Sequence, residues 1–155
     1  FLENLDPIAW MALAFSSYDA MLPNMDTMAA RLLHEFSLGE CQYQPMRDLS
    51  RGQRYKTALA TLIALDRELW LVDEPFASGI DPSAMQHFRR YARQAAERGH
   101  TILYTTQILE IVESFADRVI VIHKGRLVAY DTLEQIRSQL SESQSLHDYF
   151  QQFQV

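Results

Sequence analysis

Cysteine is almost absent from this chain, which has Cys41 as its single thiol among 155 residues. One cysteine excludes both an intrachain disulfide and a cysteine-based zinc cluster, and it favours a reducing, cytosolic environment. Positive charge is also scarce, because 14 Lys and Arg residues stand against 20 Asp and Glu residues and leave a net charge of −6. No basic run could neutralise a row of phosphates, so we expect no nucleic-acid partner.

Long apolar runs are missing as well. No stretch reaches the ~20 apolar residues that span a bilayer, and residues 1–15 lack the basic start of a secretory signal. If the protein works at a membrane, another subunit must hold it there. The chain also opens at Phe1, inside an apolar and acidic stretch, instead of at a methionine. We therefore expect a fragment of a longer protein.

Residues 1–40 have the apolar periodicity of two helices. Apolar side chains recur at the three- and four-residue intervals of a helix face: Trp10, Leu13, Ala14 and Met21, then Met28, Leu32, Leu33 and Phe36. Pro23 and Asn24 separate the two stretches, with Asp26 as the expected N-cap of the second helix and Gly39 as its C-terminal stop. A helical hairpin is predicted here.

Three short apolar runs have the pattern of fully buried parallel strands: residues 69–72, 101–105 and 119–122. Helical segments over residues 82–98 and 108–116 separate these runs, with Pro82 at the first helical position and Gly99 just past the end. The alternation of strand and helix is typical of a parallel sheet with flanking helices. The predicted fold class is α/β.

The C-terminal part begins with a predicted hairpin. Lys124 and Gly125 form a tight turn into a strand over residues 127–130, which most simply gives an antiparallel pair. Helical segments over residues 132–140 and 145–153 are expected to follow.

Polar residues stand directly after the predicted strands, where ligands bind in α/β sheets. They are Asp73 and Glu74, then Thr106 and Gln107, then His123 and Lys124. Adjacent carboxylates have a specific use in nucleotide hydrolysis, in which one holds Mg²⁺ through water and the other orients the attacking water. The alternative is that Asp73 and Glu74 only end a strand and begin a loop.

A second candidate site is the start of a helix at residues 49–53, Leu-Ser-Arg-Gly-Gln. Its backbone N–H groups, the Ser50 hydroxyl and the positive end of the helix dipole together suit a phosphate oxygen. The alternative is an ordinary capped helix, with Ser50 as N-cap and Gln53 completing a capping box. The order of the motifs along the chain favours the phosphate site.

Four motifs in this order resemble those of the ATP-binding cassette (ABC) ATPases. Residues 49–53 are similar to the signature motif, 69–75 to the Walker B strand with its catalytic glutamate, 78–82 to the D-loop and 101–107 to the switch strand. The likeness extends from residue 49 to 140. Residues 145–153 resemble the short terminal helix of exporter-type cassettes.

The resemblance implies a P-loop NTPase-like parallel sheet with flanking helices, in an incomplete cassette. Residues 1–48 would be a helical subdomain facing transmembrane partners, 49–131 the core, and 132–155 the C-terminal helices. Two cassettes would face each other, so that the signature motif contacts ATP held by the partner cassette. The implied signature residues are Ser50, Arg51, Gly52 and Gln53. Asp73 would hold Mg²⁺ through water, Glu74 and Gln107 would be catalytic, and Asp81 would report across the interface.

Two departures from the family pattern limit this likeness. The sequence has no G-x-x-x-x-G-K-[ST] P-loop, so this chain alone should not bind ATP tightly and is expected to be the C-terminal portion of a longer cassette. Gln107 stands where the family usually has a histidine. A glutamine amide cannot become cationic near neutral pH, so slower hydrolysis is predicted.

The resemblance therefore implies the ATP-hydrolysing subunit of an ABC transporter, peripheral on the cytoplasmic face of the cell membrane and paired with a second cassette, identical or different. Solute would move through a separate membrane partner, with export favoured over import. The alternative is a non-hydrolytic, cassette-derived interaction or regulatory module. A third possibility, an ABC ATPase of DNA repair or translation, usually carries coiled-coil insertions or paired cassettes, and neither is seen here.

Overall fold

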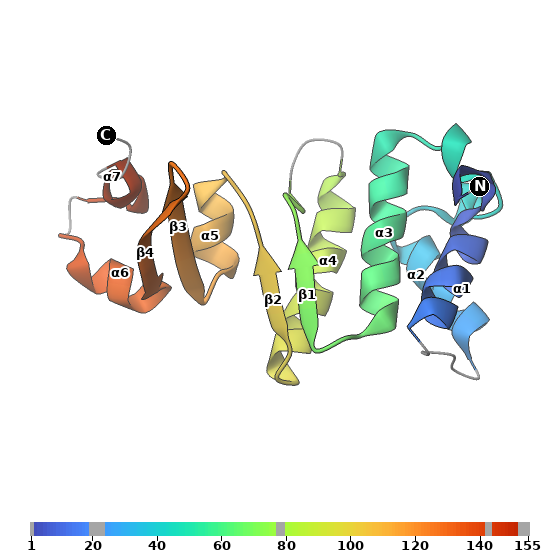
Figure 1. Ribbon diagram of the computed structural model, residues 1–155, viewed down its shortest axis with the longest axis horizontal. Helices are drawn as coiled ribbons and strands as arrows, with labels where there is room; N and C mark the ends of the chain where they lie inside the picture. The colour runs from blue at the N-terminus through green and yellow to red at the C-terminus, as the bar shows by residue number, and fades with distance from the viewer. Residues whose placement is uncertain (1, 19–23, 77–79, 142–143, 152–155) are drawn as a thin grey trace. The chain divides into compact units, whose positions relative to one another are not determined.

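The computed structural model describes residues 2–18, 24–76, 80–141 and 144–151, and the chain divides into two compact units. The first unit is Phe1–Thr105 and the second is Thr106–Val155. In the first unit, α1 (Pro7–Ser17), α2 (Met25–Glu35) and α3 (Arg51–Leu65) precede β1 (Leu69–Val72), α4 (Pro82–Glu97) and β2 (Thr101–Tyr104). Short 3-10 helices cover Leu2–Asn4, Gly39–Cys41 and Met46–Asp48. Figure 1 labels the helices and strands.

Helix α1 confirms the first predicted helix but buries a different face. Its buried residues are Pro7, Met11 and Phe15, whereas Leu13, which was expected to be part of the apolar face, is 41% exposed. The Asp6 side chain caps this helix by accepting the Ala9 N–H at 2.8 Å. This cap and Pro7 at the first helical position fix the start of the helix, and the core face then follows at four-residue intervals.

Helix α2 has the predicted apolar face, with Leu32, Leu33 and Phe36 each at most 1% exposed. Both of its expected end signals were wrong. Asn24 is the N-cap, without a side-chain bond, and Asp26 lies in the first turn. The helix ends at Glu35 with Phe36 as C-cap, well before Gly39, and Ser37 just past the cap has a φ of 56°.

The C-terminus of α2 is a Schellman motif, because the Ser37 N–H donates to the His34 carbonyl at 2.9 Å and the Leu38 N–H to the Leu33 carbonyl at 2.7 Å. Leu38 and Leu33 are both fully buried, and an apolar contact between these positions commonly accompanies the motif. Tertiary burial of Leu38 therefore ends the helix where a serine, not a glycine, takes the left-handed conformation.

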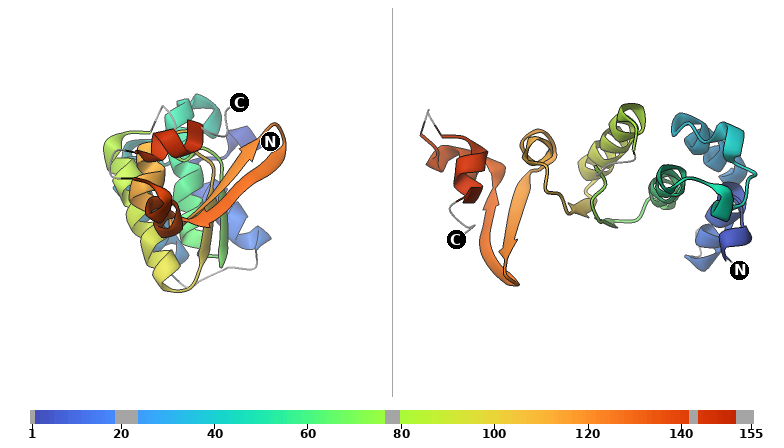
Figure 2. Two further views of the ribbon diagram at one scale, coloured as in Figure 1. Left: turned by 90° about the vertical axis from the view of Figure 1, so that its left-hand side faces the viewer. Right: turned by 90° about the horizontal axis from the view of Figure 1, so that it is seen from above.

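Strands β1 and β2 confirm the predicted parallel pair, in register from Leu69↔Thr101 to Val72↔Tyr104. Helix α4 lies along one face of this pair (Figures 1 and 2). On that face, Trp70 is 1% exposed and its ring centroid is 6.4 Å from that of Phe88 on α4. Within the described residues the other face is open, since Leu71 is 66% exposed. The prediction of a fully buried strand was therefore wrong on one face.

The second unit contains α5 (Leu109–Phe115), β3 (Arg118–His123), β4 (Arg126–Thr132), α6 (Leu133–Gln139) and α7 (Leu146–Gln151). Strands β3 and β4 form the predicted antiparallel hairpin, whose turn residues Lys124 and Gly125 both have positive φ. Positive φ at both central residues is the requirement of the two-residue turn that matches strand twist.

The strand β3 was expected to extend the parallel sheet, but it pairs with β4 in a separate two-stranded sheet. Every second side chain of β3 is exposed, which differs from a strand buried on both faces. The buried core of this unit comes instead from its helices, where Val112, Leu133, Ile136 and Leu146 pack together.

Candidate functional site

The carboxyl end of the β1–β2 pair brings the predicted carboxylates beside a hydroxyl. Asp73 and Glu74 follow β1 directly, and Thr105 follows β2. The Thr105 N–H donates to the Val72 carbonyl at 3.1 Å, which continues the strand ladder by one residue. The Thr105 hydroxyl donates to Asp73 Oδ1 at 2.6 Å and accepts the Glu74 N–H at 2.9 Å. Asp73 and Glu74 are therefore joined through one side chain.

Glu74 has an unusual backbone conformation, with a φ of 48°. Residues other than glycine enter this left-handed region at a cost of roughly 1 kcal/mol or more, and they do so mostly at turns and functional sites. The half-buried Glu74 thus leaves the strand direction immediately after Asp73, ahead of the buried Pro75. The chain turns where the two carboxylates were predicted to take different roles.

Helix α3 contacts the same strand end through Tyr55. The Tyr55 hydroxyl donates to the Asp73 backbone carbonyl at 2.9 Å. Burial, followed by the negative charges of Asp73 and Glu74, raises the pKa of Tyr55 above its usual value. The phenol therefore keeps its proton at neutral pH and remains a hydrogen-bond donor to the strand end.

The N-terminus of α3 has the capping box that the sequence offered as the alternative to a phosphate site. The Ser50 side chain accepts the Gln53 N–H at 3.2 Å, and the Gln53 side chain accepts the Ser50 N–H at 2.8 Å. This capping box is compatible with a ligand, because a serine hydroxyl that accepts one bond still has its own proton to donate. Arg51 and Gly52 lie in the first turn, where backbone N–H groups have no acceptor within the helix.

A buried lysine links α3 to the start of α4. Lys56 is 8% exposed, and its Nζ lies 2.9 Å from Asp81 Oδ2. Asp81 Oδ1 accepts the Ala84 N–H at 2.9 Å, so the same carboxylate caps α4. The Ala84 N–H, and then the Lys56 ammonium, lower the pKa of Asp81. Residues 78 and 79 of the expected D-loop lie outside the described residues.

The pKa of Asp81 predicts how stability depends on pH. A carboxylate with a lowered pKa stabilises the fold above its unfolded-state pKa of about 3.9, and this contribution is lost as the pH falls through the folded-state value. We therefore expect Asp81→Asn to cost about 1 kcal/mol at pH 7, since the Asp81 side chain is 43% exposed, and to flatten the acid dependence of stability below about pH 4.

Urea denaturation at several pH values measures this effect. Asp26→Asn, which changes an exposed carboxylate in the first turn of α2, is the control for the loss of one negative charge. Equal acid slopes for wild type and Asp81→Asn would contradict the prediction.

Gln107 belongs to the second unit. The Ile108 N–H donates to the Thr106 hydroxyl at 3.1 Å, which places the exposed Gln107 at the apex of a turn ahead of α5. The first unit thus holds Ser50–Gln53, Asp73, Glu74 and Asp81, whereas Gln107 lies in the second unit.

The donor set at the strand end fits Mg²⁺ bound together with a phosphate. In the described parts of the chain, no three His, Cys, Asp or Glu side chains come together as a metal site. Mg²⁺ keeps several waters and commonly binds through one or two carboxylates plus substrate phosphates. Asp73 is exposed and has one oxygen fixed by Thr105, which suits this mode of binding.

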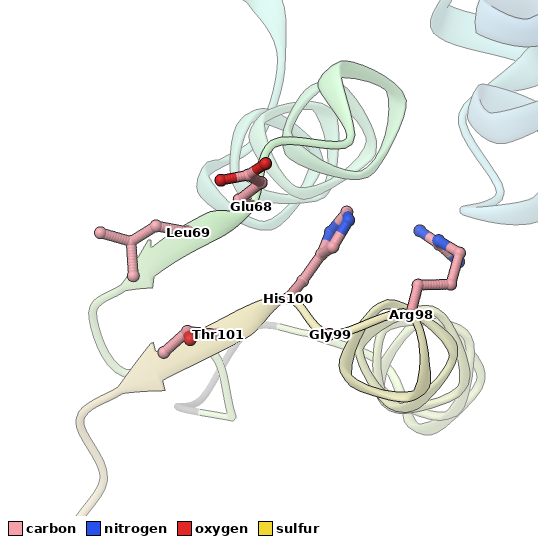
Figure 3. A pocket seen from close by; sticks show the side chains of 6 residues that line it. All are labelled: Glu68, Leu69, Arg98, Gly99, His100 and Thr101. Atoms are coloured by element: carbon pink, nitrogen blue, oxygen red, sulfur yellow. The ribbon is translucent and has the colours of Figure 1, made fainter.

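A hollow of about 420 Å³ opens at the opposite, amino end of the strands. Figure 3 shows Glu68, Arg98 and His100 around it, with Leu69, Gly99 and Thr101. Ligands of parallel α/β sheets bind at the carboxyl ends of the strands. We therefore assign the candidate site to the end that carries Asp73, and not to this hollow.

Three residues of the site were not singled out by the sequence pattern: Tyr55, Lys56 and Thr105. The sequence could have indicated Thr105. If the apolar runs that begin at residues 69 and 101 pair from their first residues, residue 73 lies opposite residue 105. Tyr55 and Lys56 both lie on α3, and their partners Asp73 and Asp81 follow 18 and 25 residues later. Local spacing therefore gave no signal for these two residues.

Known proteins resemble this chain in sequence and in structure. The family model described as "ABC transporter" matches residues 2–77. The chain is 32% identical over 115 residues to the daunorubicin/doxorubicin resistance ATP-binding protein DrrA of Streptomyces peucetius, covering 74% of this chain and 34% of that protein. It is 34% identical over 109 residues to the sulfate/thiosulfate import ATP-binding protein CysA of Mesorhizobium japonicum, covering 70% of this chain and 31% of that protein.

A solved structure described as an ATP-binding subunit of an ABC transporter superposes on the whole chain with a TM-score of 0.90 and 27% identity. The chain covers 65% of that structure. It spans about a third of the length of the two curated relatives above. The likeness therefore concerns one part of a longer cassette.

Proposed function

The chain belongs to the family of ABC transporter ATP-binding domains, and we propose that it supplies the signature motif and the catalytic glutamate of a cassette that hydrolyses ATP to drive solute transport. The observation that carries this proposal is the Asp73–Glu74 pair at the carboxyl end of β1, held by Thr105 and by Tyr55 of the signature helix. Paired carboxylates anchored beside a capped helix start are suited to phosphoryl chemistry.

Each residue has one role in this proposal. Mg²⁺, when bound with ATP, would neutralise charge on the phosphates. Asp73 would hold the water shell of that ion, and Glu74 would accept a hydrogen bond from the attacking water and orient it. The Ser50 hydroxyl and the N–H groups of Arg51 and Gly52 would bind the γ-phosphate of ATP held by a second cassette, with Gln53 keeping Ser50 in place.

The same proposal includes partners at the membrane. None of the helices in the described ranges has the length and hydropathy needed to cross a bilayer. Residues 1–48 would contact separate transmembrane subunits from the cytoplasmic face, and they expose Leu13 at 41% and Tyr43 at 73%. A hollow of about 590 Å³ in this helical part is lined by Ile8, Asp26, Thr27, Ala30 and Tyr43. Because the relatives include a resistance protein and an import protein, we extend the proposal to transport in either direction.

The proposal is tested by measuring ATP hydrolysis by the complete transporter that contains this chain. Mg²⁺-dependent phosphate release is the expected result. ATP binding without phosphate release would favour the second candidate, a non-hydrolytic regulatory module, which draws its support from Gln107 in the place of the family's histidine.

Gln107→His should raise turnover, if the glutamine amide is a weakened contact to the γ-phosphate. A histidine that can be protonated adds positive charge to stabilise the transition state, so we expect a several-fold increase, on the order of tenfold at most. Steady-state phosphate release at saturating ATP measures it, with His123→Gln as a control at a histidine of β3. Unchanged turnover would show that the site has adapted to glutamine.

A further inference from the structure

The Thr105 hydroxyl occupies a specific place between the two carboxylate residues. Its oxygen lies 2.6 Å from Asp73 Oδ1 and 2.9 Å from the Glu74 backbone nitrogen. Thr105 directly follows β2, whereas Asp73 and Glu74 directly follow β1, so these contacts cross between the ends of neighbouring strands. Neither contact involves α3, whose Tyr55 bonds the Asp73 backbone carbonyl instead.

The two hydrogen bonds fix each other's direction. A threonine hydroxyl has one proton and two lone pairs, and here the proton goes to Asp73 while a lone pair accepts the Glu74 N–H. Rotation about the Cα–Cβ bond would break both bonds at once. The bond to Asp73 is charge-assisted and short, which places it among the stronger hydrogen bonds.

The bond to Glu74 anchors a strained residue. Glu74 has a φ of 48°, and such conformations persist where the surroundings over-determine them. Its N–H is the donor in the bond to Thr105, so this contact ties down the backbone at the point where the chain leaves the strand. The direction of the Glu74 side chain follows from that backbone.

We propose that Thr105 is a positioning residue for ATP hydrolysis: its hydroxyl fixes the Asp73 carboxylate and the Glu74 backbone together, so that both carboxylates meet the substrate in one arrangement. This inference rests on the proposed function. One oxygen of Asp73 is directed to Thr105, and the second, which has no hydrogen-bond partner among the described residues, can accept from the water shell of Mg²⁺. Thr105 itself does not contact the reacting atoms.

Three variants of the complete transporter test the proposal. Thr105→Val keeps the shape and the β-branch but removes the hydroxyl, whereas Thr105→Ser keeps the hydroxyl. Thr101→Val makes the same change at the other end of β2, on the same exposed face, and is the matched control. Thr105→Ala replaces the valine variant if that protein does not fold.

Two readouts are needed. The first is nucleotide-free hydrogen–deuterium exchange of the peptide that contains the Glu74 amide, which should exchange faster in Thr105→Val than in wild type. The second is steady-state hydrolysis, in which kcat should fall about ten- to hundredfold, while the KM for ATP stays within about twofold because the variant keeps the Asp73 carboxylate and loses only its fixed direction. Thr105→Ser and Thr101→Val should match wild type in both.

Wild-type kcat in Thr105→Val, or failure of Thr105→Ser to restore kcat, overturns the proposal. A fall in kcat without faster exchange also overturns it, because Thr105 would then act by another route. Glu74→Gln is measured in the same assay. If that variant turns over normally, the proposed function itself fails, and this result is distinguishable from a failure that concerns Thr105 alone.

Discussion

Glu74→Gln abolishes ATP turnover by the complete transporter while ATP binding persists: this is the largest effect that we expect. The substitution keeps the size of the side chain and removes the negative charge that would orient and polarise the attacking water. Loss of a positioned acid–base group typically costs about 10²–10⁴-fold in rate. Phosphate release at saturating Mg²⁺-ATP measures turnover, and equilibrium binding of labelled ATP measures affinity.

The chain offers a matched control for this variant. Glu68→Gln makes the same change just before β1, at the opposite end of the strand from Glu74, where Glu68 is exposed. Its turnover should equal that of wild type. Undiminished turnover in Glu74→Gln would remove the catalytic role of Glu74, and loss of ATP binding in that variant would indicate a folding defect instead.

Ser50→Arg is expected to block ATP-driven closure of the cassette pair. The change removes the hydroxyl that accepts the Gln53 N–H, and it places a long cation at the positive end of the α3 dipole. It also fills the space in front of the helix start where a phosphate oxygen of the partner's ATP would bind. Loss of the cap costs about 1 kcal/mol of stability, which is small beside the loss of the interface.

Size-exclusion chromatography with ATP measures closure, and the Glu74→Gln background prevents hydrolysis from reopening the pair. In that background and with ATP, the complete cassette with Ser50 should elute as a dimer. The same cassette with Ser50→Arg should elute as a monomer. Ser83→Arg is the control, because Ser83 is an exposed serine in the first turn of α4. A dimer in the Ser50→Arg protein would count against the signature assignment.

Local sequence patterns predicted those elements whose ends are fixed by local chemistry. Helix α4 begins at Pro82 and is followed by Gly99, which has a φ of 93°, as expected for a glycine just past a helix. The end of α2 was missed because it depends on the burial of Leu38, a tertiary effect. Likewise, the continuous apolar run of β1 gave no sign that one of its faces is exposed.

In the candidate site too, local features could be predicted from the sequence and tertiary contacts could not. Asp73, Glu74 and Ser50 could be proposed from local pattern, because each follows or begins a recognisable element. Their partners could not, since the Glu74 contact with Thr105 spans 31 residues and that of Lys56 with Asp81 spans 25. Such contacts depend on strand register and helix packing, which periodicity alone does not define. The role of Gln107 stays a prediction.

The apolar sequence of β1, Leu-Trp-Leu-Val, affects how strictly the register between β1 and β2 is defined. Every residue is apolar, so a slip of one position that brings Leu71 to the place of the buried Val72 would exchange the two faces without moving a polar group into the core. Hydrophobicity does not select against this slip, so side-chain shape and polar contacts must do so. Trp70 fits against Phe88, and Asp73 meets Thr105 only in the native alignment. The hydrogen bond between Asp73 and Thr105 thus also favours the native alignment of the strand over the slipped one.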